Sequence, residues 1–508
     1  MKILNLILAV WNLCVLFFLA STAFTQWPGL HHDSALYTTP IIKSAAFGLW
    51  EFDGYVPALV QLGNGSFNFH GQLYQFVFGK VLRCASYESL FRWTAALNVL
   101  TYTVYLALGW KSFRLYFPRL GPWLATGMAA VTALACLYLQ GRPEHLLPLL
   151  MIVPFLMHEW RVTAPFAKSA AYVSLGLTIV LSPIPGVLCF MGAIAWIAIR
   201  HRNQWIREII LCGALSVSAA LAVLLVACPV NPWQWVHNTI IAGGHATGLP
   251  FTVIPSNLGV FNSVAHLDLP LWNVFCLGAF GVLALSLVRQ RFWWLTLVYV
   301  VVWVFFMIPR TLSYSYFGFM PVIMLALVGR EAGLLALPVK LRRLPVILVS
   351  AFGLCGAAGL FRAMLLAIMF YREGVSFEQT STTVRQLEST LNSNREQIGF
   401  IWLARPSFVA FSKPEKFLVT ITVNVLEDKK DLDLDAYEVK FHRKVRYLLL
   451  PQLGHVAEPP PTLNDGMFVL ESNGWTKRRA RFFGLKLGGA MPGYQFALYR
   501  RKEAASHQ

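Results

Sequence analysis

Long apolar runs, separated by short polar turns, dominate the first 370 residues of the chain. About 20 consecutive apolar residues cross the hydrocarbon core of a bilayer as a helix, so the pattern predicts a polytopic α-helical membrane protein. Eleven runs are candidate transmembrane helices: 1–24, 94–110, 120–139, 146–158, 170–182, 184–199, 209–228, 270–288, 292–308, 315–328 and 344–369.

Some of these runs leave alternatives open. The first could be a signal peptide, but we predict a retained span because no convincing small-residue cleavage site precedes Asp33. The run at 146–158 is short, and the prolines of Ser182-Pro183-Ile184-Pro185-Gly186 interrupt the pair within 170–199. Such an interruption is also typical of the broken helices of transporters.

The pattern changes at Tyr371, after which polar residues predominate. Residues 371–508 contain 20 Lys and Arg and 15 Asp and Glu. The stretch "VSFEQTSTTVRQLESTL" has helical spacing, whereas "IGFIWLA", "FLVTITVN", "VRYLLLPQ" and "YQFALYRR" are typical of strands. The sequence therefore predicts a transmembrane domain, 1–370, with a long first outer loop, 24–92, followed by a small soluble α/β domain, 371–508.

The net charge of +18 changes the picture only through its distribution. Lys and Arg collect in alternate loops, and the long loop 229–269 contains neither. By the positive-inside rule, the N-terminus is cytosolic and both Asp33 and the C-terminal domain lie outside the cytosol. The basic balance thus needs no nucleic acid as a partner. No C-x-x-C spacing occurs among the eight cysteines, which argues against a cysteine-based zinc site.

Acidic residues on the outer side are candidates for function, because ionisable groups near a bilayer are costly unless they line a cavity. The membrane part has nine acidic residues, and the predicted orientation places six of them outside: Asp33, Glu51, Asp53, Glu88, Glu144 and Asp268. Two stretches of the first outer loop, 34–50 and 73–82, are too short to span. We expect both to be helices along the membrane surface, with apolar residues toward lipid.

Two further outer turns carry charge. In "QGRPEHLL", Glu144 could simply be an acid at a helix N-terminus, but Arg142 and His145 accompany it. In "IPRTLSYSYFGFMPVI", Arg310 is the only charge between two apolar runs, and Tyr314 follows it. Arg310 could snorkel to the interface. Alternatively, it binds a lipid phosphate through its planar guanidinium group.

Together these outer stretches resemble the GT-C superfamily of membrane glycosyltransferases, in particular the bacterial family related to protein O-mannosyltransferases and the aminoarabinose transferases of lipid A. That family carries a D-E-A-x-Y stretch, a glycine, and then K-P-P-L-Y or H-P-P-L-Y. The corresponding stretches here read Asp33-Ser34-Ala35-Leu36-Tyr37, Gly48, and His70-Gly71-Gln72-Leu73-Tyr74. The family's R-x-[DE] turn resembles Arg142-Pro143-Glu144, and its stretch before a late span resembles Arg310 to Pro321.

The resemblance implies an inverting glycosyltransferase that moves a sugar from a polyprenyl-phosphate donor to a lipid, glycan or protein acceptor on the outer face of the bacterial inner membrane. Asp33 would be the catalytic base, although an N-cap of the following segment also explains it. Substrate-binding residues would be Tyr37, His70, Tyr74, Arg142, Glu144, Arg310 and Tyr314. A divalent metal is an open alternative, with Asp33, His32, Glu144 and His145 as candidate ligands.

Two departures from the family pattern matter for function. Ser34 stands where the family has a second acid, which bears on metal binding and acceptor chemistry, and Gly71-Gln72 replaces the double proline. Ser34 leaves open an inactive relative that binds lipid-linked sugars. A multi-pass transporter is the other competing interpretation, because many apolar spans and a few outer charges also suit one.

Overall fold

The computed structural model describes part of the chain, including eight of the predicted membrane helices and the strands of the C-terminal region. The described residues are 2–25, 37, 41–42, 44–45, 71–159, 165–201, 203–228, 231–244, 343–372, 386–387, 389–391, 397–401, 417–420, 445–451, 468–473, 481–482, 485–486 and 496–502. The predicted runs at 270–288, 292–308 and 315–328 lie outside them, as do Arg310 and Tyr314.

Eight of the apolar runs are helices, as predicted. They are α1 (Lys2–Thr25), α5 (Tyr87–Tyr116), α6 (Gly121–Tyr138), α7 (Leu147–Glu159), α8 (Pro165–Leu181), α9 (Pro183–Arg200), α10 (Trp205–Ala227) and α16 (Leu344–Arg372). Shorter helical segments accompany them: α4 (Gln72–Gln75), the π-helical turn η1 (Phe76–Val81), the 3₁₀ turn η2 (Pro143–Leu146) and α11 (Pro232–Gly244). Among the described helices, α1, α10 and α16 are long and apolar enough to cross a membrane.

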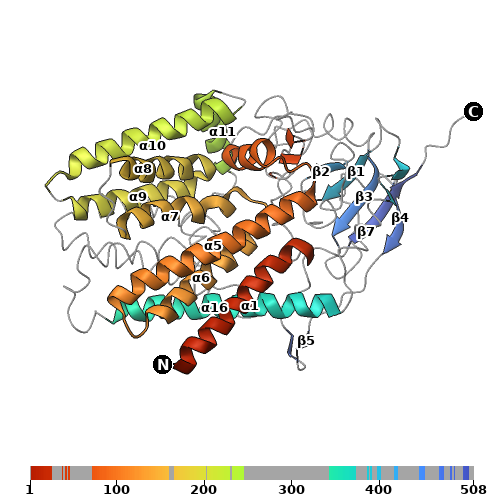
Figure 1. Cartoon of the computed structure of the whole chain (residues 1–508). Coiled ribbons are helices and arrows are strands. Elements are labelled where there is room, and N and C mark those ends of the chain that lie inside the picture. The colour runs from red at the N-terminus through yellow and green to blue at the C-terminus, as the bar shows by residue number, and fades with distance from the viewer. Residues whose placement is uncertain are drawn as a thin grey trace, which may run out of the picture.

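The long helices form two groups that pack side by side (Figure 1). One group contains α1, α5, α6 and α16; the other contains α7, α8, α9 and α10, and α5 contacts α7 between them. The N-terminus lies at one end of the helices, and the strands lie at the other (Figure 1). Within the second group, Lys168 and Glu208 form an ion pair that joins the first turns of α8 and α10.

The outer faces of α1 and α10 are apolar and exposed. Ile7 and Phe17 of α1 are 57% and 79% exposed, and Ile210 and Leu225 of α10 are 65% and 71% exposed. Exposure of such apolar surfaces to water would be unfavourable. In lipid they are expected, because apolar side chains can face the hydrocarbon while the helix satisfies its own backbone hydrogen bonds. The chain is therefore an integral membrane protein.

In the described residues of 34–50 and 73–82, the apolar side chains do not have the predicted orientation. Tyr37, Ile41, Tyr74 and Phe78 are at most 2% exposed and belong to the protein core. The expected lipid-facing orientation of these residues is wrong, because the segments pack against each other and against the helix ends instead of lying alone on a surface. Among the residues of η1, Val81 is the one that is strongly exposed, at 61%.

The helices α6 and α16 approach unusually closely. A Cβ atom added to Gly127 would lie 2.8 Å from the Cα atom of Gly353, and one added to Gly356 would lie 2.8 Å from the backbone of Val131. Such contacts are shorter than side chains permit, so the crossing requires glycine. Small residues at helix crossings are typical of membrane proteins, where close backbone packing supplies much of the association energy.

We therefore expect Gly127→Ala to destabilise the protein by about 1–3 kcal/mol, because α6 and α16 must separate to admit one methyl group. The matched control is Gly213→Ala on α10, since a Cβ atom at Gly213 meets nothing within 4 Å. Thermal unfolding of the two purified variants measures the difference. Equal midpoints would show that α6 and α16 do not cross at Gly127.

The strands of the C-terminal region form one mixed sheet and a short hairpin. The sheet has the order β2-β1-β3-β7-β4, in which β1 pairs in parallel with β2 and β3, and β7 pairs antiparallel with β3 and β4. The strands are β1 (Gln397–Ile401), β2 (Phe417–Thr420), β3 (Val445–Pro451), β4 (Phe468–Asn473) and β7 (Phe496–Arg501); β5 (Arg481–Phe482) and β6 (Leu485–Lys486) form the hairpin.

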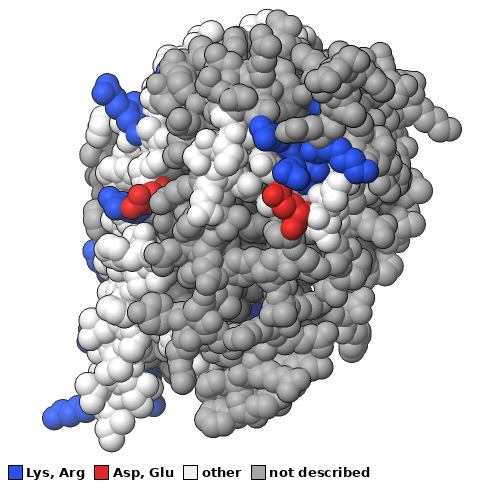
Figure 2. Space-filling view, turned by 90° about the vertical axis from the view of Figure 1, so that its right-hand side faces the viewer, with Lys and Arg blue, Asp and Glu red and all other residues white. Residues whose placement is uncertain are grey.

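The four predicted strands are thus confirmed, as β1, β2, β3 and β7, whereas β4, β5 and β6 were not predicted. Basic side chains gather on the surface at the sheet end of the molecule (Figure 2). The sheet contains the basic residues Arg446 of β3 and Arg500 and Arg501 of β7, and Lys502 directly follows β7. The acidic residue Glu471 lies on β4. Both signs of charge therefore occur on this part of the surface.

Candidate active site

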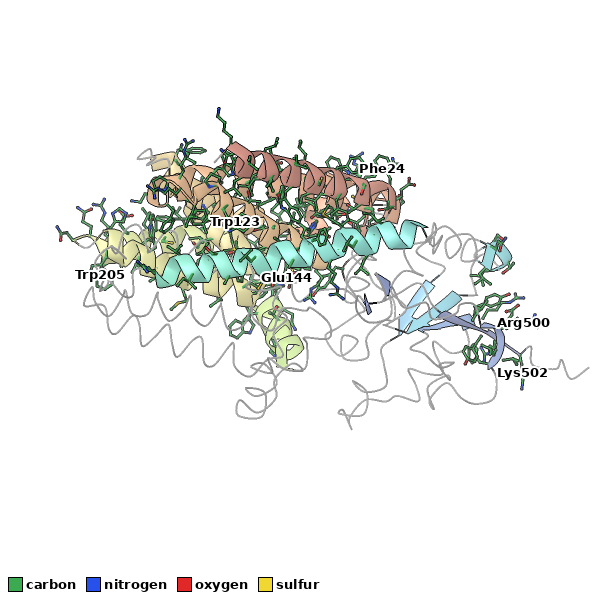
Figure 3. The ribbon with its side chains drawn as sticks, turned by 90° about the horizontal axis from the view of Figure 1, so that it is seen from below. Phe24, Trp123, Glu144, Trp205, Arg500 and Lys502 are labelled. Atoms are coloured by element: carbon green, nitrogen blue, oxygen red, sulfur yellow. The ribbon has the colours of Figure 1, made fainter. Side chains whose placement is uncertain are left out.

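A buried ion pair forms the centre of the candidate site. Nε of Arg142 lies 3.0 Å from Oε2 of Glu144, and Nη2 lies 3.3 Å from Oε1, so the guanidinium and carboxylate groups meet through two hydrogen bonds. The two side chains are 8% and 1% exposed. Figure 3 shows Glu144 between Trp205, at one end of the helices, and Arg500 in the sheet. This pairing explains why Arg142 accompanies Glu144 in the sequence.

The turn that carries the pair is built by local sequence. Arg142 has an extended backbone, and Pro143 occupies the first position of η2, where its missing N–H costs no hydrogen bond. The glutamate thus begins a helical segment that continues into α7. The predicted helix start is confirmed, but its acid is held mainly by an arginine.

Ser182 supplies a third contact to the carboxylate. Its hydroxyl donates to Oε1 of Glu144 over 2.9 Å. Ser182 is the single residue between α8 and α9, and a Cβ atom added to Gly186 would lie 2.5 Å from the Cα atom of Ile179. The chain therefore folds back on itself here. The alternative of one broken transporter helix at 182–186 is wrong, because α8 and α9 are two helices packed together.

Tyr37 lies over the ion pair. The guanidinium carbon of Arg142 is 5.9 Å from the centroid of the Tyr37 ring, within the range of a cation–π interaction. Gly71 lets the two outer segments meet here: it has φ +89°, and an added Cβ atom would lie 2.7 Å from Pro143 and 3.1 Å from the Tyr37 ring. Only glycine combines that backbone with that space.

Tyr74 is the second buried tyrosine at the site. Burial raises the pKa of Tyr74 well above its ordinary value, and the nearby Cys84 thiol and Glu144 carboxylate add to the rise. A hydrogen-bonding interaction with the backbone of Gly141 offsets part of it. Its hydroxyl nevertheless makes no hydrogen bond of ordinary geometry among the described residues. Tyr74 is therefore a neutral group that can donate and accept hydrogen bonds. We name Tyr37, Tyr74, Arg142, Glu144 and Ser182 the Arg142 cluster.

His145 points away from the pair into the helices. Its Nε2 atom lies 2.6 Å from Oδ1 of Asn98 on α5, so Nε2 donates and Nδ1 is the unprotonated nitrogen. Gln140, which precedes the turn, donates a hydrogen bond of 2.9 Å to the hydroxyl of Thr94. Thr94 lies one helical turn before Asn98 on α5. These two bonds hold the turn against α5. Neither was predicted, because Thr94 and Asn98 look like isolated polar residues within an apolar run.

Burial lowers the pKa of His145 to about 3, from an ordinary value of 6.5. As the pH falls below 6.5, the unfolded chain gains a proton that the folded chain excludes, so stability present above pH 6.5 is lost progressively toward pH 3. We expect a loss of about 2 kcal/mol between pH 7 and pH 5 from this residue. Thermal unfolding should show a smaller pH dependence in His145→Gln, and an equal one would contradict the assignment.

The described residues do not form a metal site of the usual kind. They contain no group of three or more His, Cys, Asp and Glu side chains. Both oxygens of Glu144 are bound to Arg142, and Ser182 also binds one of them, so this carboxylate does not fit the role of a metal ligand. His32 and Asp33, the other candidates, lie outside the described residues.

The structure thus brings together Tyr37, Tyr74, Arg142 and Glu144 of the predicted substrate-binding set and places His145 beside them. The other predicted residues lie outside the described part of the chain: Asp33, His70, Arg310 and Tyr314. Ser182 and Gln72 were missed. Gln72, fully buried, accepts a hydrogen bond from the indole of Trp235 on α11 over 2.8 Å.

No protein-family model and no curated protein sequence matches the chain. Among solved structures, ArnT from Cupriavidus metallidurans bound to undecaprenyl phosphate is 13% identical with a TM-score of 0.51, and the match covers 99% of this chain and 98% of that chain. The same protein in the apo state is 12% identical, with a TM-score of 0.45 and 98% coverage of both chains.

The Archaeoglobus fulgidus oligosaccharyltransferase in complex with Zn and sulfate is 13% identical, with a TM-score of 0.45 over 87% of this chain and 67% of that chain. The match to the first ArnT structure extends over nearly the whole chain. It shows that the chain shares the fold of this ArnT, which is a GT-C glycosyltransferase, and the predicted resemblance is confirmed at the level of fold.

Proposed function

We propose that the protein is an inverting glycosyltransferase that moves a sugar from a polyprenyl-phosphate donor to an acceptor outside the cytosol. The observation that carries the proposal is the buried Arg142–Glu144 pair beneath Tyr37, within a fold shared with a transferase whose crystal structure contains undecaprenyl phosphate. Burying two charges is costly, and a structural role alone is served as well by apolar residues. Binding of an anionic substrate by Arg142 would account for the retention of the buried pair.

The reaction needs a base and a stabilised leaving group. Asp33 removes the proton of the acceptor hydroxyl as its oxygen bonds to the anomeric carbon. The bond between that carbon and the phosphate oxygen breaks at the same time. Polyprenyl phosphate leaves with the bonding electrons, and attack from the opposite side inverts the anomeric configuration.

The leaving phosphate needs positive charge where its negative charge develops. We assign this role to Arg310 and Arg142, because guanidinium groups bind phosphate oxygens through parallel hydrogen bonds. Glu144 holds the guanidinium of Arg142 in place, and Ser182 in turn holds the carboxylate of Glu144. The N-termini of α7 and α9 begin beside this cluster and add partial positive charge.

Turnover of purified protein in lipid nanodiscs tests the proposal. Polyprenyl-phosphate hexose and pentose donors are supplied with lipid, glycan or peptide acceptors, and release of polyprenyl phosphate is measured. The expected result is acceptor-dependent release, with an inverted anomeric centre in the product by NMR. Binding of donor without release would identify an inactive relative, and absence of donor binding would reject the proposal.

Chelation with EDTA in the same assay measures metal dependence. With phosphate charge assigned to Arg142 and Arg310, turnover should survive chelation. Loss of turnover that one divalent metal restores would overturn that assignment and return His32 and Asp33 to consideration as ligands.

A further inference from the structure

Some buried side chains at and near the Arg142 cluster lack hydrogen bonds among the described residues. Gln75 of α4 is fully buried, and neither its Nε2 nor its Oε1 atom has a partner among the described residues. The Ser44 hydroxyl is also buried without a partner there, and the Tyr74 hydroxyl has only the Gly141 backbone near it, with no hydrogen bond of ordinary geometry. The amide of Gln75 and the hydroxyl of Ser44 have therefore lost their hydrogen bonds to water without gaining others, which is unfavourable for folding. A ligand that satisfies them would explain why they are retained.

The three residues lie on two segments that pack along each other. A Cβ atom added to Gly71 would lie 3.1 Å from the Tyr37 ring at one end, and one added to Gly79 would lie 3.2 Å from Ile41 and Ser44 at the other. Gln75 occupies the middle of the 71–79 segment, four residues from each glycine. Gly71 of the same segment contacts Pro143 next to the ion pair, and α4, which carries Gln75, packs against the η2 turn.

Other buried amides nearby differ from Gln75 in a useful way. Asn98 and Gln140 each make one hydrogen bond, to His145 and to Thr94, that fixes the position of the η2 turn. Gln72, one helical turn before Gln75, is bonded to Trp235. These three have structural roles that the described contacts explain. Gln75 has none.

We propose that Gln75, with Tyr74 and Ser44, binds hydroxyl groups of the sugar carried by the lipid-phosphate donor. This inference rests on the proposed function and specifies which part of the donor the 71–79 segment recognises. Sugar hydroxyls both donate and accept hydrogen bonds. An amide offers two donors and an acceptor, and serine and tyrosine hydroxyls offer both, so the three side chains match that chemistry.

Gln75→Leu tests the proposal, with Gln72→Leu as its matched control on the same short helix. Three quantities are measured: the thermal unfolding midpoint, the dissociation constant of sugar-free polyprenyl phosphate, and the KM for a polyprenyl-phosphate sugar. Gln75→Leu should leave the midpoint unchanged or raise it, because it removes an unsatisfied buried amide. It should leave binding of polyprenyl phosphate unchanged and raise the donor KM about tenfold. Gln72→Leu should lower the midpoint, since Trp235 loses its acceptor.

Two results would overturn the proposal. A midpoint that falls in Gln75→Leu as far as in Gln72→Leu would show that Gln75 has a structural partner. An unchanged donor KM at an unchanged midpoint would show that Gln75 does not contact the sugar. Failure of the wild-type protein to bind polyprenyl phosphate would instead reject the proposed function, so the two failures are distinguishable.

Discussion

Asp33→Asn is expected to reduce sugar transfer by a factor of about 10²–10⁴, because the amide cannot take the proton of the acceptor hydroxyl. The substitution also distinguishes the two interpretations of this residue. Asparagine caps a helix about as well as aspartate, so a purely structural Asp33 would tolerate it. Expression and thermal stability should therefore match the wild type while transfer is lost.

The control is Asp33→Ala, which removes both the base and the cap. We expect it to be as inactive as Asp33→Asn and in addition less stable, by about 1 kcal/mol if the cap exists. Transfer by Asp33→Asn at the wild-type rate would exclude Asp33 as the base. Binding of polyprenyl phosphate should be unaffected in both variants, since the assigned phosphate groups are arginines.

Substitutions in the buried ion pair should have the largest effects on stability. Arg142→Met or Glu144→Leu leaves one charge buried without its partner, and we expect each to cost about 3–5 kcal/mol. The double variant, Arg142→Met with Glu144→Leu, should recover most of that loss, because two apolar side chains pack without an unpaired charge. It should nevertheless fail to transfer sugar.

Thermal unfolding and donor turnover, measured on all four proteins, separate stability from function. Single variants as stable as the wild type would contradict the buried pair. A double variant that is stable and active would show that the pair only holds the η2 turn in place. Recovery of stability without recovery of turnover is the outcome that supports a role in binding the donor.

Local patterns predicted most of the described helices, but helix boundaries needed information beyond apolarity. The run at 94–110 belongs to a helix that begins at Tyr87, because Ser86 and Ser89 cap each other's backbone and Glu88 pairs with Arg92. Helix α11 was missed within the long loop 229–269. Its signal was Asn231, whose side chain accepts from the backbone of Gln234, followed by proline at the first helical position.

The candidate site was predictable only in part, because its contacts join distant parts of the chain. Arg142 and Glu144 are two residues apart, so their motif was visible. Ser182 reaches Glu144 across 38 residues, and Asn98 reaches His145 across 47. No spacing rule connects such pairs. The orientation of Tyr37 and Phe78 was wrong for the same reason: an amphipathic segment covers lipid or protein equally well, and only tertiary packing decides.

The order of these contacts along the chain has a consequence for biosynthesis. As the ribosome delivers the protein, α5 is already made when the 140–145 turn appears, so Gln140 and His145 can find Thr94 and Asn98 at once. The hydrogen bond from Ser182 to Glu144 can form only after the turn between α8 and α9 has been synthesised. The bond between Gln72 and Trp235 spans 163 residues and closes last. Ribosome-stalled chains that end beyond Gly244 should therefore already contain the assembled Arg142 cluster, before α16 and the sheet have been synthesised.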